Sequence, residues 1–388
     1  MAMVAERNNA AARSIPCFAF RNAGGAVLGE GPGTVLPRGP AATLGARTAA
    51  FFRDAPPGAV LAGAMPFGRE AADYLVSPHT SRRLAPAAAD PAPPGDTPRW
   101  RLRHEPDAAG YAASVRRVLG IMAQEAGTAD ALTKIVLSRS LVAEADAPIG
   151  TALLLERLSA DPAVTGFLVP LPPRDGTARL LTGATPELLL SRRGARVLSH
   201  PLAGSARRQA DPAGDRAAAE ALFRSDKDQR EHAIVAEFIL DTLAPFCAVL
   251  AAPAGTQLTS TRSMWHLGTR IEGELRDPSV GAAELAAALH PTPAVCGVPR
   301  DKAARLIGEI ERHDRDFYAG AVGWCDAAGD GDWYVSIRCA EIAGNTARLY
   351  AGAGIVPGSD PGAEADETAA KYGALLEALG IRMKDDSP

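Results

Sequence analysis

The chain has 388 residues, of which 47% are hydrophobic and 22% are charged, and its formal net charge is −4. This length can bury a large core, and a negative net charge without a Lys/Arg block argues against a nucleic-acid partner. The five cysteines are scattered with no CxxC pair, and we find neither a signal peptide nor an apolar run long enough to cross a bilayer, so we expect a reduced, cytoplasmic protein without a membrane partner.

The first 105 residues are rich in alanine, glycine and proline. We expect them to form a variable N-terminal part of one domain that spans residues 1–388, with the catalytic core at residues 106–382. Residues 60–67, VLAGAMPF, are typical of a buried strand. Residues 85–98 combine several prolines with a glycine, and this combination predicts an exposed loop because both residue types interrupt helices and strands.

Helical and strand-like segments follow one another after this loop. Apolar residues at helical spacing, from Tyr111 to Met122, predict a helix that opens at Pro106 and ends at Gly127. We predict further helices at residues 151–158, 210–243, 280–291, 300–314 and 364–380. We predict strands at residues 134–145, 166–172, 178–208, 256–275 and 333–356. Strict β-α-β alternation is absent, so the pattern favours an α+β fold in which helices cover antiparallel sheets.

Two pairs of carboxylates lie on predicted helices. Glu364, Glu367 and Lys371 lie three and four residues apart, so they share one helix face. On an isolated helix this pattern is most often an exposed ion pair, but the glycine-rich AGAGIVPGSDP directly upstream offers backbone N–H groups to an anion. Asp228 and Glu231 form a second pair in DKDQREH, which taken alone is typical of a solvated face. Together the two pairs predict a hard-oxygen site that suits Mg²⁺.

Three other charged residues lie beside apolar runs. Lys134 begins KIVLSRSL, where a lysine is either a strand-edge residue without a role or a desolvated base. Glu187 precedes three leucines in GATPELLL, and apolar walls raise the pKa of a carboxyl group so that it can donate a proton. A buried base and a buried acid predict an exchange of hydroxyl groups on a ring. Arg338 leaves two interpretations open, a core ion pair or a fork for a carboxylate.

These residues lie in sequence blocks that resemble the chorismate-utilising enzymes, the family of anthranilate synthase component I. The blocks are KIVLSR, LTGATPELLLS, SHPLAGSARR, DKDQREH, LHPTPAVCGVP, ERHDRDFYAGAVGW, YVSIRCAEI and LYAGAGIVPGSDPGAEADET. They extend from Lys134 to about Gly380 and are most similar to the isochorismate synthases of aryl-siderophore pathways. The resemblance implies a layered α/β/β/α sandwich with the site between its sheets, and chorismate and Mg²⁺ as ligands.

The resemblance also implies roles for individual residues. Glu231 and Glu367 are expected to contact the metal, with Asp228 and Glu364 in support. The residues expected to contact the substrate are His266, Ala294, Tyr318, Arg338, Gly352, Lys371, Ala203 and Gly204. From its position alone, His266 is more typical of a buried structural histidine than of a site residue.

Two positions point to water as the nucleophile. In aminodeoxychorismate synthases the block equivalent to PLAGS carries a lysine that attacks the ring, where this chain has Ala203. In the amine-adding enzymes a glutamine replaces the KIVLSR lysine, where this chain has Lys134. The resemblance therefore implies that Lys134 activates water for attack at C2 and that Glu187 protonates the departing C4 hydroxyl. The expected product is isochorismate.

Two alternatives stay open at this point. A salicylate synthase would share the base and the acid and then eliminate pyruvate from isochorismate in the same site. A non-catalytic chorismate-binding homologue is disfavoured because every acid, base and metal position is filled. No segment resembles a glutamine amidotransferase, so we expect no such partner subunit. Nothing in the sequence resembles an obligate interface, so we expect a monomer. The sequence does not predict whether the product enters siderophore, salicylate or menaquinone synthesis.

Overall fold

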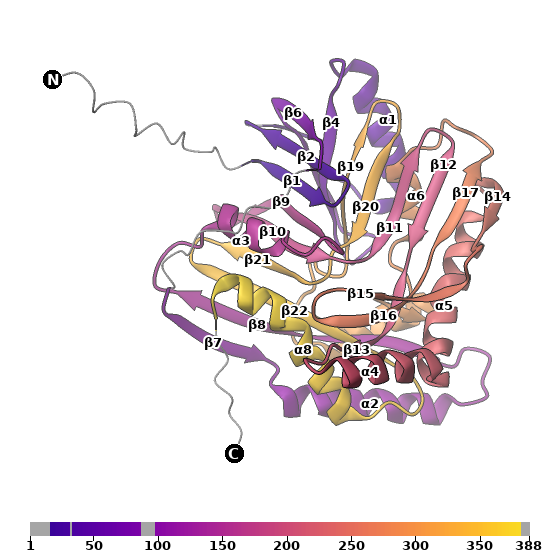
Figure 1. Cartoon of the computed structure of the whole chain (residues 1–388). Helices are drawn as coiled ribbons and strands as arrows, with labels where there is room; N and C mark the ends of the chain where they lie inside the picture. The colour runs from indigo at the N-terminus through magenta and orange to yellow at the C-terminus, as the bar shows by residue number, and fades with distance from the viewer. Residues whose placement is uncertain (1–15, 32, 87–97, 382–388) are drawn as a thin grey trace.

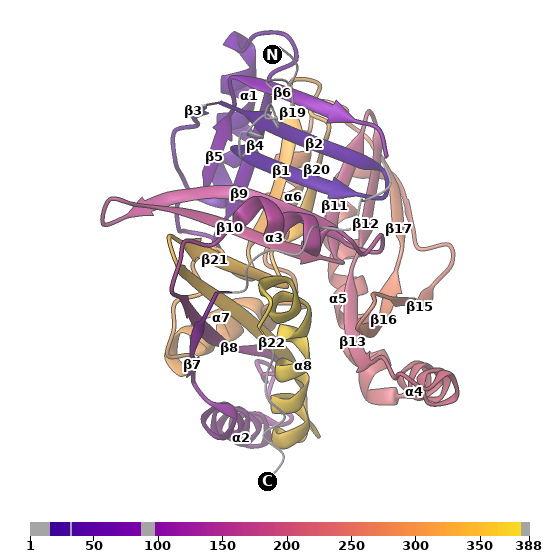
Figure 2. The ribbon, with the colours of Figure 1, turned by 60° about the vertical axis from the view of Figure 1, so that its left-hand side comes forward.

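The structure is a computed structural model that describes residues 16–31, 33–86 and 98–381 (Figure 1). Most of the predicted loop at residues 85–98 falls outside these ranges. The described chain forms two large sheets and one small sheet, with helices on the outer faces (Figures 1 and 2). None of the helices in the described ranges is long and apolar enough to cross a membrane.

The first sheet has ten strands, and each of its pairings is antiparallel. From one edge to the other its strands are β18 (Gly297–Val298), β8 (Lys134–Ala145), β22 (Thr346–Ile355), β21 (Cys339–Ala343), β10 (Thr177–Thr185), β9 (Thr165–Arg174), β1 (Phe18–Asn22), β2 (Gly25–Glu30) and β6 (Thr80–Leu84). The tenth strand, β7 (Trp100–Glu105), pairs with β8. Residues 135–144 of β8 pair with β22, and this pairing fixes the position of Lys134, the first residue of β8.

The second sheet has nine strands, again paired antiparallel. Their order is β14 (Cys247–Ala251), β17 (Ile271–Leu275), β12 (Arg196–His200), β11 (Leu188–Arg193), β20 (Gly331–Val335), β19 (Ala321–Asp326), β4 (Val60–Met65), β5 (Tyr74–Ser77) and β3 (Thr34–Val35). The small sheet consists of β13 (Leu202–Arg207), β16 (Met264–Thr269) and β15 (Thr256–Ser260). The N-terminal strands therefore extend both large sheets.

The helices divide between the sheets. Those associated with the first sheet are α2 (Ala108–Glu125), α3 (Thr151–Leu158), α7 (Arg300–Ile310) and α8 (Pro361–Leu379). Those on the side of the second sheet are the short 3-10 helix η1 (Ala41–Thr43), α1 (Leu44–Asp54), α5 (Asp226–Leu243) and α6 (Ala282–Leu289), and α4 (Pro212–Arg224) packs on the small sheet. The predicted α+β architecture, with helices over antiparallel sheets, is confirmed.

Apolar side chains from both large sheets form the core between them. Phe18 and Phe167 of the first sheet are fully buried in the same cluster as Leu61 and Leu190 of the second. Fully burying one such side chain stabilises the fold by roughly 1.5–3 kcal/mol. This core fixes the two sheets against each other and so positions the strand ends that carry charged residues.

Three segments differ from the sequence prediction. The helix expected at residues 210–243 is two helices, because Ser225 leaves the helical conformation and caps α5 by accepting a hydrogen bond from the backbone N–H of Asp228. The helix expected to reach residue 314 ends at Ile310, where Glu311 turns to an extended conformation. Arg338, expected within a strand, lies between β20 and β21 with a φ of 52°. Those two strands belong to different sheets.

Candidate active site

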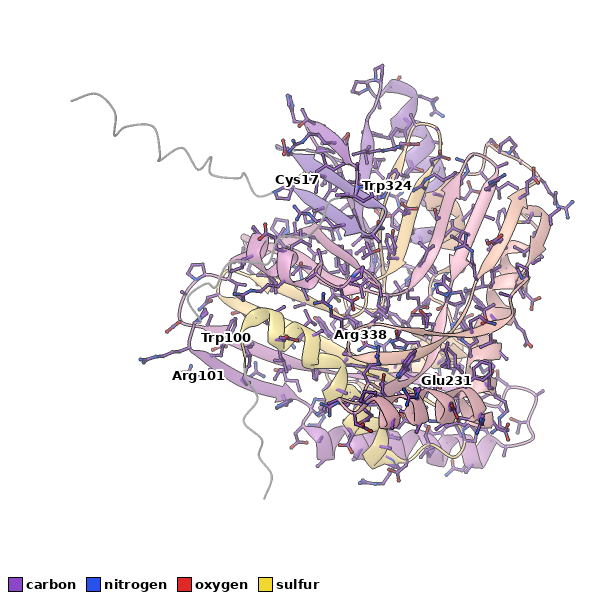
Figure 3. The ribbon with its side chains drawn as sticks, in the orientation of Figure 1. Cys17, Trp100, Arg101, Glu231, Trp324 and Arg338 are labelled. Carbon is purple, nitrogen blue, oxygen red and sulfur yellow. The ribbon has the colours of Figure 1, made fainter. Side chains whose placement is uncertain are left out.

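The predicted site residues gather around one cavity, which lies where β8 and β22 of the first sheet meet the small sheet and helices α5 and α8. Glu231 and Arg338, two of its residues, lie toward the middle of the molecule (Figure 3). The described residues that line it are Val136, Pro186, Glu187, Leu202, Ala203, Gly204, Ser205, Lys227, Asp228, Glu231, His266, Ala294, Val295, Tyr318, Ile337, Arg338, Tyr350, Ala351, Gly352, Gly354, Glu367 and Lys371. Of the predicted site residues, Lys134 and Glu364 do not line it.

Lys134 is the first residue of β8 and its side chain is fully buried. Its Nζ lies 3.0 Å from Oε1 of Glu231, although the geometry is not that of a hydrogen bond. Glu231 lines the cavity and Lys134 lies behind it. The predicted base and one predicted metal ligand are therefore in direct contact.

Glu187 lies in the turn between β10 and β11 and is 3% exposed. Burial raises its pKa to about 8, although a backbone hydrogen bond and the charges of Lys134, Arg338 and Lys371 act in the opposite direction. The carboxyl group therefore carries its proton near neutral pH. This state is the one that a general acid requires.

Asp228 and Glu231 project into the cavity from the first two turns of α5. Burial raises the pKa of Asp228, and the charges of Glu231 and Glu367 raise it further, while Ser225 and Lys227 lower it. The two helices α5 and α8 thus bring like charges together, as the sequence predicts.

Glu364 and Glu367 lie on the same face of α8, near its N-terminus, but their surroundings differ. Glu367 accepts hydrogen bonds from Ser205 Oγ at 2.8 Å and pairs with Lys371 Nζ at 2.5 Å. Burial alone would raise its pKa, but Lys371 and Ser205 lower it overall. Glu364 is 2% exposed and pairs with Lys227 through Oε1 at 3.0 Å. Its other oxygen is buried without a hydrogen-bond partner among the described residues.

These carboxylates suit a magnesium ion in their donor chemistry, since Mg²⁺ prefers carboxylate oxygens. The partnerless Oε2 of Glu364 supports this fit. The pKa of Glu364 supports it as well, since burial raises this pKa and the charge of Glu367 raises it further. As placed, however, the described residues include no group of three or more His, Cys, Asp or Glu side chains that could hold a metal. The magnesium ion therefore stays a prediction.

Two cationic or polar groups face the cavity without a partner. Arg338 has no ion pair or side-chain hydrogen bond among the described residues, although the charges of Glu367 and Glu187 act on it. Nε2 of His266 is buried and also has no hydrogen-bond partner there. Burial, reinforced by Arg338 and Lys371, lowers the pKa of His266 to about 3, so the ring is neutral. Arg338 is therefore available to an anionic ligand, and Nε2 of His266 is available to a hydrogen-bond partner.

Two glycines of β22 leave room where a side chain would obstruct the cavity. A Cβ atom on Gly352 would lie 3.0 Å from the hydroxyl oxygen of Tyr318, and one on Gly354 would lie 2.2 Å from Oε1 of Glu231. The carbonyl of Gly352 accepts a hydrogen bond from Lys371 Nζ at 2.8 Å. The wall of the cavity along β22 is therefore largely main chain.

The remaining predicted contacts lie on the other walls. Ala203 and Gly204 belong to β13, where Gly204 has a φ of 76° at an irregularity in the pairing with β16. Ala294 precedes β18, and Tyr318 lies in the turn before β19. All four line the cavity, so the structure brings together segments that are more than a hundred residues apart.

Some lining residues have no counterpart in the sequence prediction. Tyr350 stacks on Tyr318 with ring centroids 4.7 Å apart and an interplanar angle of 8°. Strand alternation could have identified it, since Tyr350 is two residues from Gly352 on the same strand. Ser205 and Lys227 each hold a predicted metal ligand, and both lie inside motifs that the sequence prediction already includes.

Comparison with known proteins adds to this geometry. Residues 70–380 match the family model described as "Chorismate binding enzyme". The isochorismate synthase DhbC of Bacillus subtilis (strain 168) is 45% identical over 329 residues, which cover 83% of this chain and 81% of that protein.

Solved structures show the same similarity. The putative 2,3-dihydroxybenzoate-specific isochorismate synthase DhbC from Bacillus anthracis is 38% identical, with a TM-score of 0.89 over 95% of this chain and 98% of that chain. Anthranilate synthase component I from Streptococcus pneumoniae TIGR4 is 20% identical, with a TM-score of 0.68 over 93% of this chain and 90% of that chain. The latter shows a shared fold.

Proposed function

This chain belongs to the chorismate-binding enzymes, and from this premise we propose that it is an isochorismate synthase, which converts chorismate to isochorismate. The observation that carries the proposal is a pair of buried groups, the Lys134 side chain behind Glu231 and the protonated Glu187 carboxyl group that lines the cavity. A 1,4 exchange of hydroxyl groups requires one group that removes a proton from water and another that gives a proton to the leaving hydroxyl.

The proposed reaction divides these tasks between two side chains. Lys134 accepts a proton from water as its oxygen bonds to C2 of the ring, and the ring double bonds shift. Glu187 donates its proton to the C4 hydroxyl, which leaves as water. One water enters and one leaves, so the reaction is an isomerisation. Ala203 supports water as the nucleophile, because it offers no amine that could attack the ring.

The proposal includes Mg²⁺, held by Glu231 and Glu367 with Asp228 and Glu364 in support. A bound cation would supply charge to hold the ring carboxylate and would take up the negative charge of Glu231. In the described structure Glu231 instead faces Lys134 at 3.0 Å.

The remaining cavity residues are proposed to orient chorismate. Arg338 lacks a carboxylate partner among the described residues and is suited to a bidentate contact with the pyruvyl carboxylate. Neutral His266 can accept a hydrogen bond from the substrate through its partnerless Nε2. Lys371, Tyr318, Gly352, Ala294, Ala203 and Gly204 complete the proposed contact surface.

We also propose a cellular setting for this activity. The product would feed an aryl-siderophore, salicylate or dihydroxybenzoate pathway, a proposal supported by the 38% identity to a protein named as 2,3-dihydroxybenzoate-specific. All five cysteines are free thiols, which supports a reducing cytoplasm. Because water is the nucleophile, an ammonia-supplying amidotransferase subunit has no role, and we propose that the protein acts as a monomer.

The experiment is to incubate the purified full-length protein with chorismate and Mg²⁺ and to separate the products by chromatography. We expect isochorismate to accumulate to an equilibrium mixture with chorismate. Salicylate and pyruvate in equal amounts would instead establish a salicylate synthase. Saturable chorismate binding without turnover would support a non-catalytic homologue and contradict the proposal.

A further inference from the structure

Behind the cavity, Arg315 lies in the irregular segment between α7 and β19 and is 4% exposed. Its guanidinium group lies over the ring of Phe67, 4.4 Å from the ring centroid. Arg315 does not line the cavity and has no part in the proton transfers proposed above. Its hydrogen bonds nevertheless go to residues that line the cavity, or to the one carboxylate that holds it in place.

Two of these hydrogen bonds join separate walls of the cavity. Nη1 of Arg315 donates to the carbonyl of Val295 at 2.8 Å, and Nη2 donates to the carbonyl of Val136 at 2.7 Å. Val136 belongs to β8 and Val295 to the segment before β18, and both line the cavity. The N–H of Val136 also donates to the carbonyl of Cys296 at 2.7 Å. The guanidinium group therefore lies where these two segments meet.

The third wall is attached through the turn that contains Arg315 itself. The N–H of Tyr318 donates to the carbonyl of Arg315 at 2.7 Å, and the guanidinium carbon lies 5.9 Å from the centroid of the Tyr318 ring. Tyr318 lines the cavity and stacks on Tyr350. One arginine thus fixes the relative positions of β8, the Val295 segment and the Tyr318 turn.

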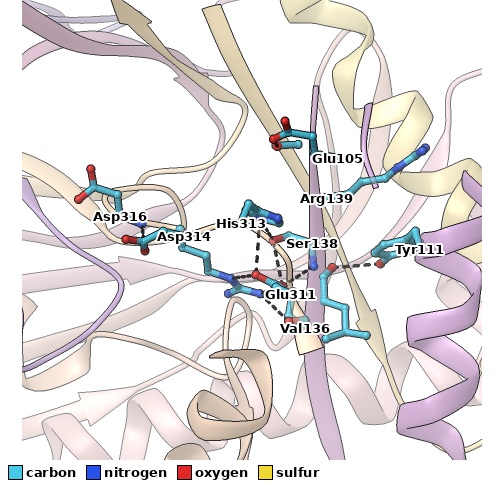
Figure 4. Close-up of polar contacts among 12 residues, drawn as sticks. Glu105, Tyr111, Val136, Ser138, Arg139, Glu311, His313, Asp314 and Asp316 are labelled. Atoms are coloured by element: carbon cyan, nitrogen blue, oxygen red, sulfur yellow. Dashed lines mark hydrogen bonds and ion pairs between the residues drawn. The ribbon is translucent and has the colours of Figure 1, made fainter. Parts of the chain in front are cut away.

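Glu311 fixes the orientation of this arginine. Its Oε2 accepts from Nε of Arg315 at 2.9 Å, and its Oε1 accepts from Nη2 at 2.6 Å. Oε1 also accepts from the backbone N–H of Ser138 at 2.6 Å and from its hydroxyl at 3.0 Å (Figure 4). A two-point contact with a planar guanidinium group sets its direction as well as its position, which a lysine ammonium cannot do.

From this geometry we propose that Arg315 is a positioning residue for chorismate, which holds three walls of the cavity in the arrangement that the substrate requires. The proposal rests on the proposed function, since it takes chorismate as the ligand. Walls that touch the substrate bind its ground state and its transition state alike, so their displacement raises KM more than it lowers kcat.

The test is the Arg315→Lys variant, which keeps a positive charge beside Glu311 but replaces the planar fork with a compact ammonium group. We expect KM for chorismate to rise about 10-fold and kcat to fall by less than about threefold. Steady-state rates at saturating Mg²⁺ give both constants, and calorimetry on the same preparation gives the midpoint of thermal unfolding.

Arg192→Lys is the matched control. Arg192 is 2% exposed, donates to the carbonyl of Ala328 at 2.8 Å and pairs with Asp330 at 3.1 Å. It does not line the cavity. We expect this variant to lose thermal stability as Arg315→Lys does, while KM and kcat per folded molecule keep their wild-type values.

A wild-type KM in Arg315→Lys, or an equal rise of KM in both lysine variants, would overturn the proposal. If Arg315→Lys does not fold, Glu311→Asp replaces it, because the shorter carboxylate keeps its charge but withdraws from Arg315. The same rise in KM is then expected, and a wild-type KM again contradicts the proposal. If the wild-type protein leaves chorismate unchanged, the proposed function fails instead, so the two failures are distinguishable.

Discussion

Two regions around the same cavity differ in how their buried charges are neutralised. Behind the cavity, each guanidinium nitrogen of Arg315 has a hydrogen-bond acceptor, and its charge is balanced by Glu311. On the side of α5 and α8, carboxylates lie close together, and one oxygen of Glu364 is buried without a partner in the described structure. The pair of Arg315 and Glu311 is complete by itself, whereas the carboxylates of α5 and α8 are stabilised further when a ligand binds.

This difference indicates that the residues around Arg315 maintain the shape of the cavity and that the carboxylates of α5 and α8 bind ligands. A fully satisfied buried network is rigid and leaves no polar atom for a ligand. Like charges in a buried site raise the free energy of the folded protein, and a cation or a substrate can lower it again. We therefore expect substitutions on the carboxylate side to affect chemistry and metal binding, and substitutions around Arg315 to affect substrate binding.

The largest effect is expected from Lys134→Ala. Loss of a positioned base lowers kcat by about 10³-fold, within the range for general acid–base catalysis. Mg²⁺ binding, measured by calorimetry, should persist because the carboxylates remain. Lys302→Ala is the control, since Lys302 pairs with Glu125 on α2 at 2.7 Å and does not line the cavity. Near-full activity of Lys134→Ala would rule out its role as the base.

Glu187→Gln should lower kcat by about 10²-fold, because an amide cannot donate the proton. The wild-type kcat should fall as pH rises through about 8, where Glu187 loses its proton. The folded pKa is raised from 4.5, so the stability linked to this group is present below pH 4.5 and is lost as pH rises to about 8.

The same variant therefore tests stability. Since glutamine is neutral at every pH, Glu187→Gln should unfold at a higher temperature than the wild type at pH 8 and show little difference at pH 4.5, the ordinary pKa of a glutamate. A shift from 4.5 to about 8 corresponds to a stabilisation of about 4 kcal/mol at the higher pH. Rate profiles and thermal melts across this range check both statements. A wild-type kcat that stays constant through pH 8 and above would contradict the assignment of the acid.

Glu367→Gln should weaken Mg²⁺ binding, because it removes one of the two proposed direct ligands. The Mg²⁺ concentration for half-maximal activity is expected to rise about 10- to 100-fold. Glu377→Gln on the same helix is the control, since Glu377 is exposed and distant in sequence from the cavity face. An unchanged Mg²⁺ requirement in Glu367→Gln would remove Glu367 from the proposed metal site.

Gly354→Ala should have the smallest catalytic effect, about a 10-fold loss of kcat/KM. Its Cβ would lie 2.2 Å from Oε1 of Glu231, so the carboxylate must move although the backbone need not. Gly120→Ala in α2 is the control, because its Cβ would meet nothing within 4 Å. That change should leave activity intact and stabilise the fold by about 0.5–1 kcal/mol. Equal activity of both variants would contradict a precise placement of Glu231.

Local periodicity predicted individual elements well. The strand expected at residues 134–145 and the helix expected at residues 151–158 have these bounds in the structure. The sequence did not predict the change of sheet at Arg338, because partners far away in the chain decide which sheet a strand joins. The division of the chain into one domain also stays a prediction.

The candidate site was predicted in part for a similar reason. Charged residues beside apolar runs, such as Lys134 and Glu187, stand out in the sequence, and the family resemblance gave them separate roles. Arg315 did not stand out because its acceptors are main-chain carbonyls. Those carbonyls, of Val295 and Val136, lie 20 and 179 residues away in the chain. No local pattern reports such contacts.

The glycines of β22 set a limit on how this cavity can be redesigned. At Gly352 and Gly354 the wall is already bare main chain, so nothing remains there to trim for a bulkier substrate. Enlargement must come from lining residues that carry removable side chains, such as Ile337 or Leu202. A side chain at either glycine would collide with a neighbour, at 2.9 Å from the carbonyl oxygen of Leu137 for Gly352 and at 2.2 Å from Oε1 of Glu231 for Gly354. Along this strand the cavity can therefore be neither widened nor narrowed without displacing those neighbours.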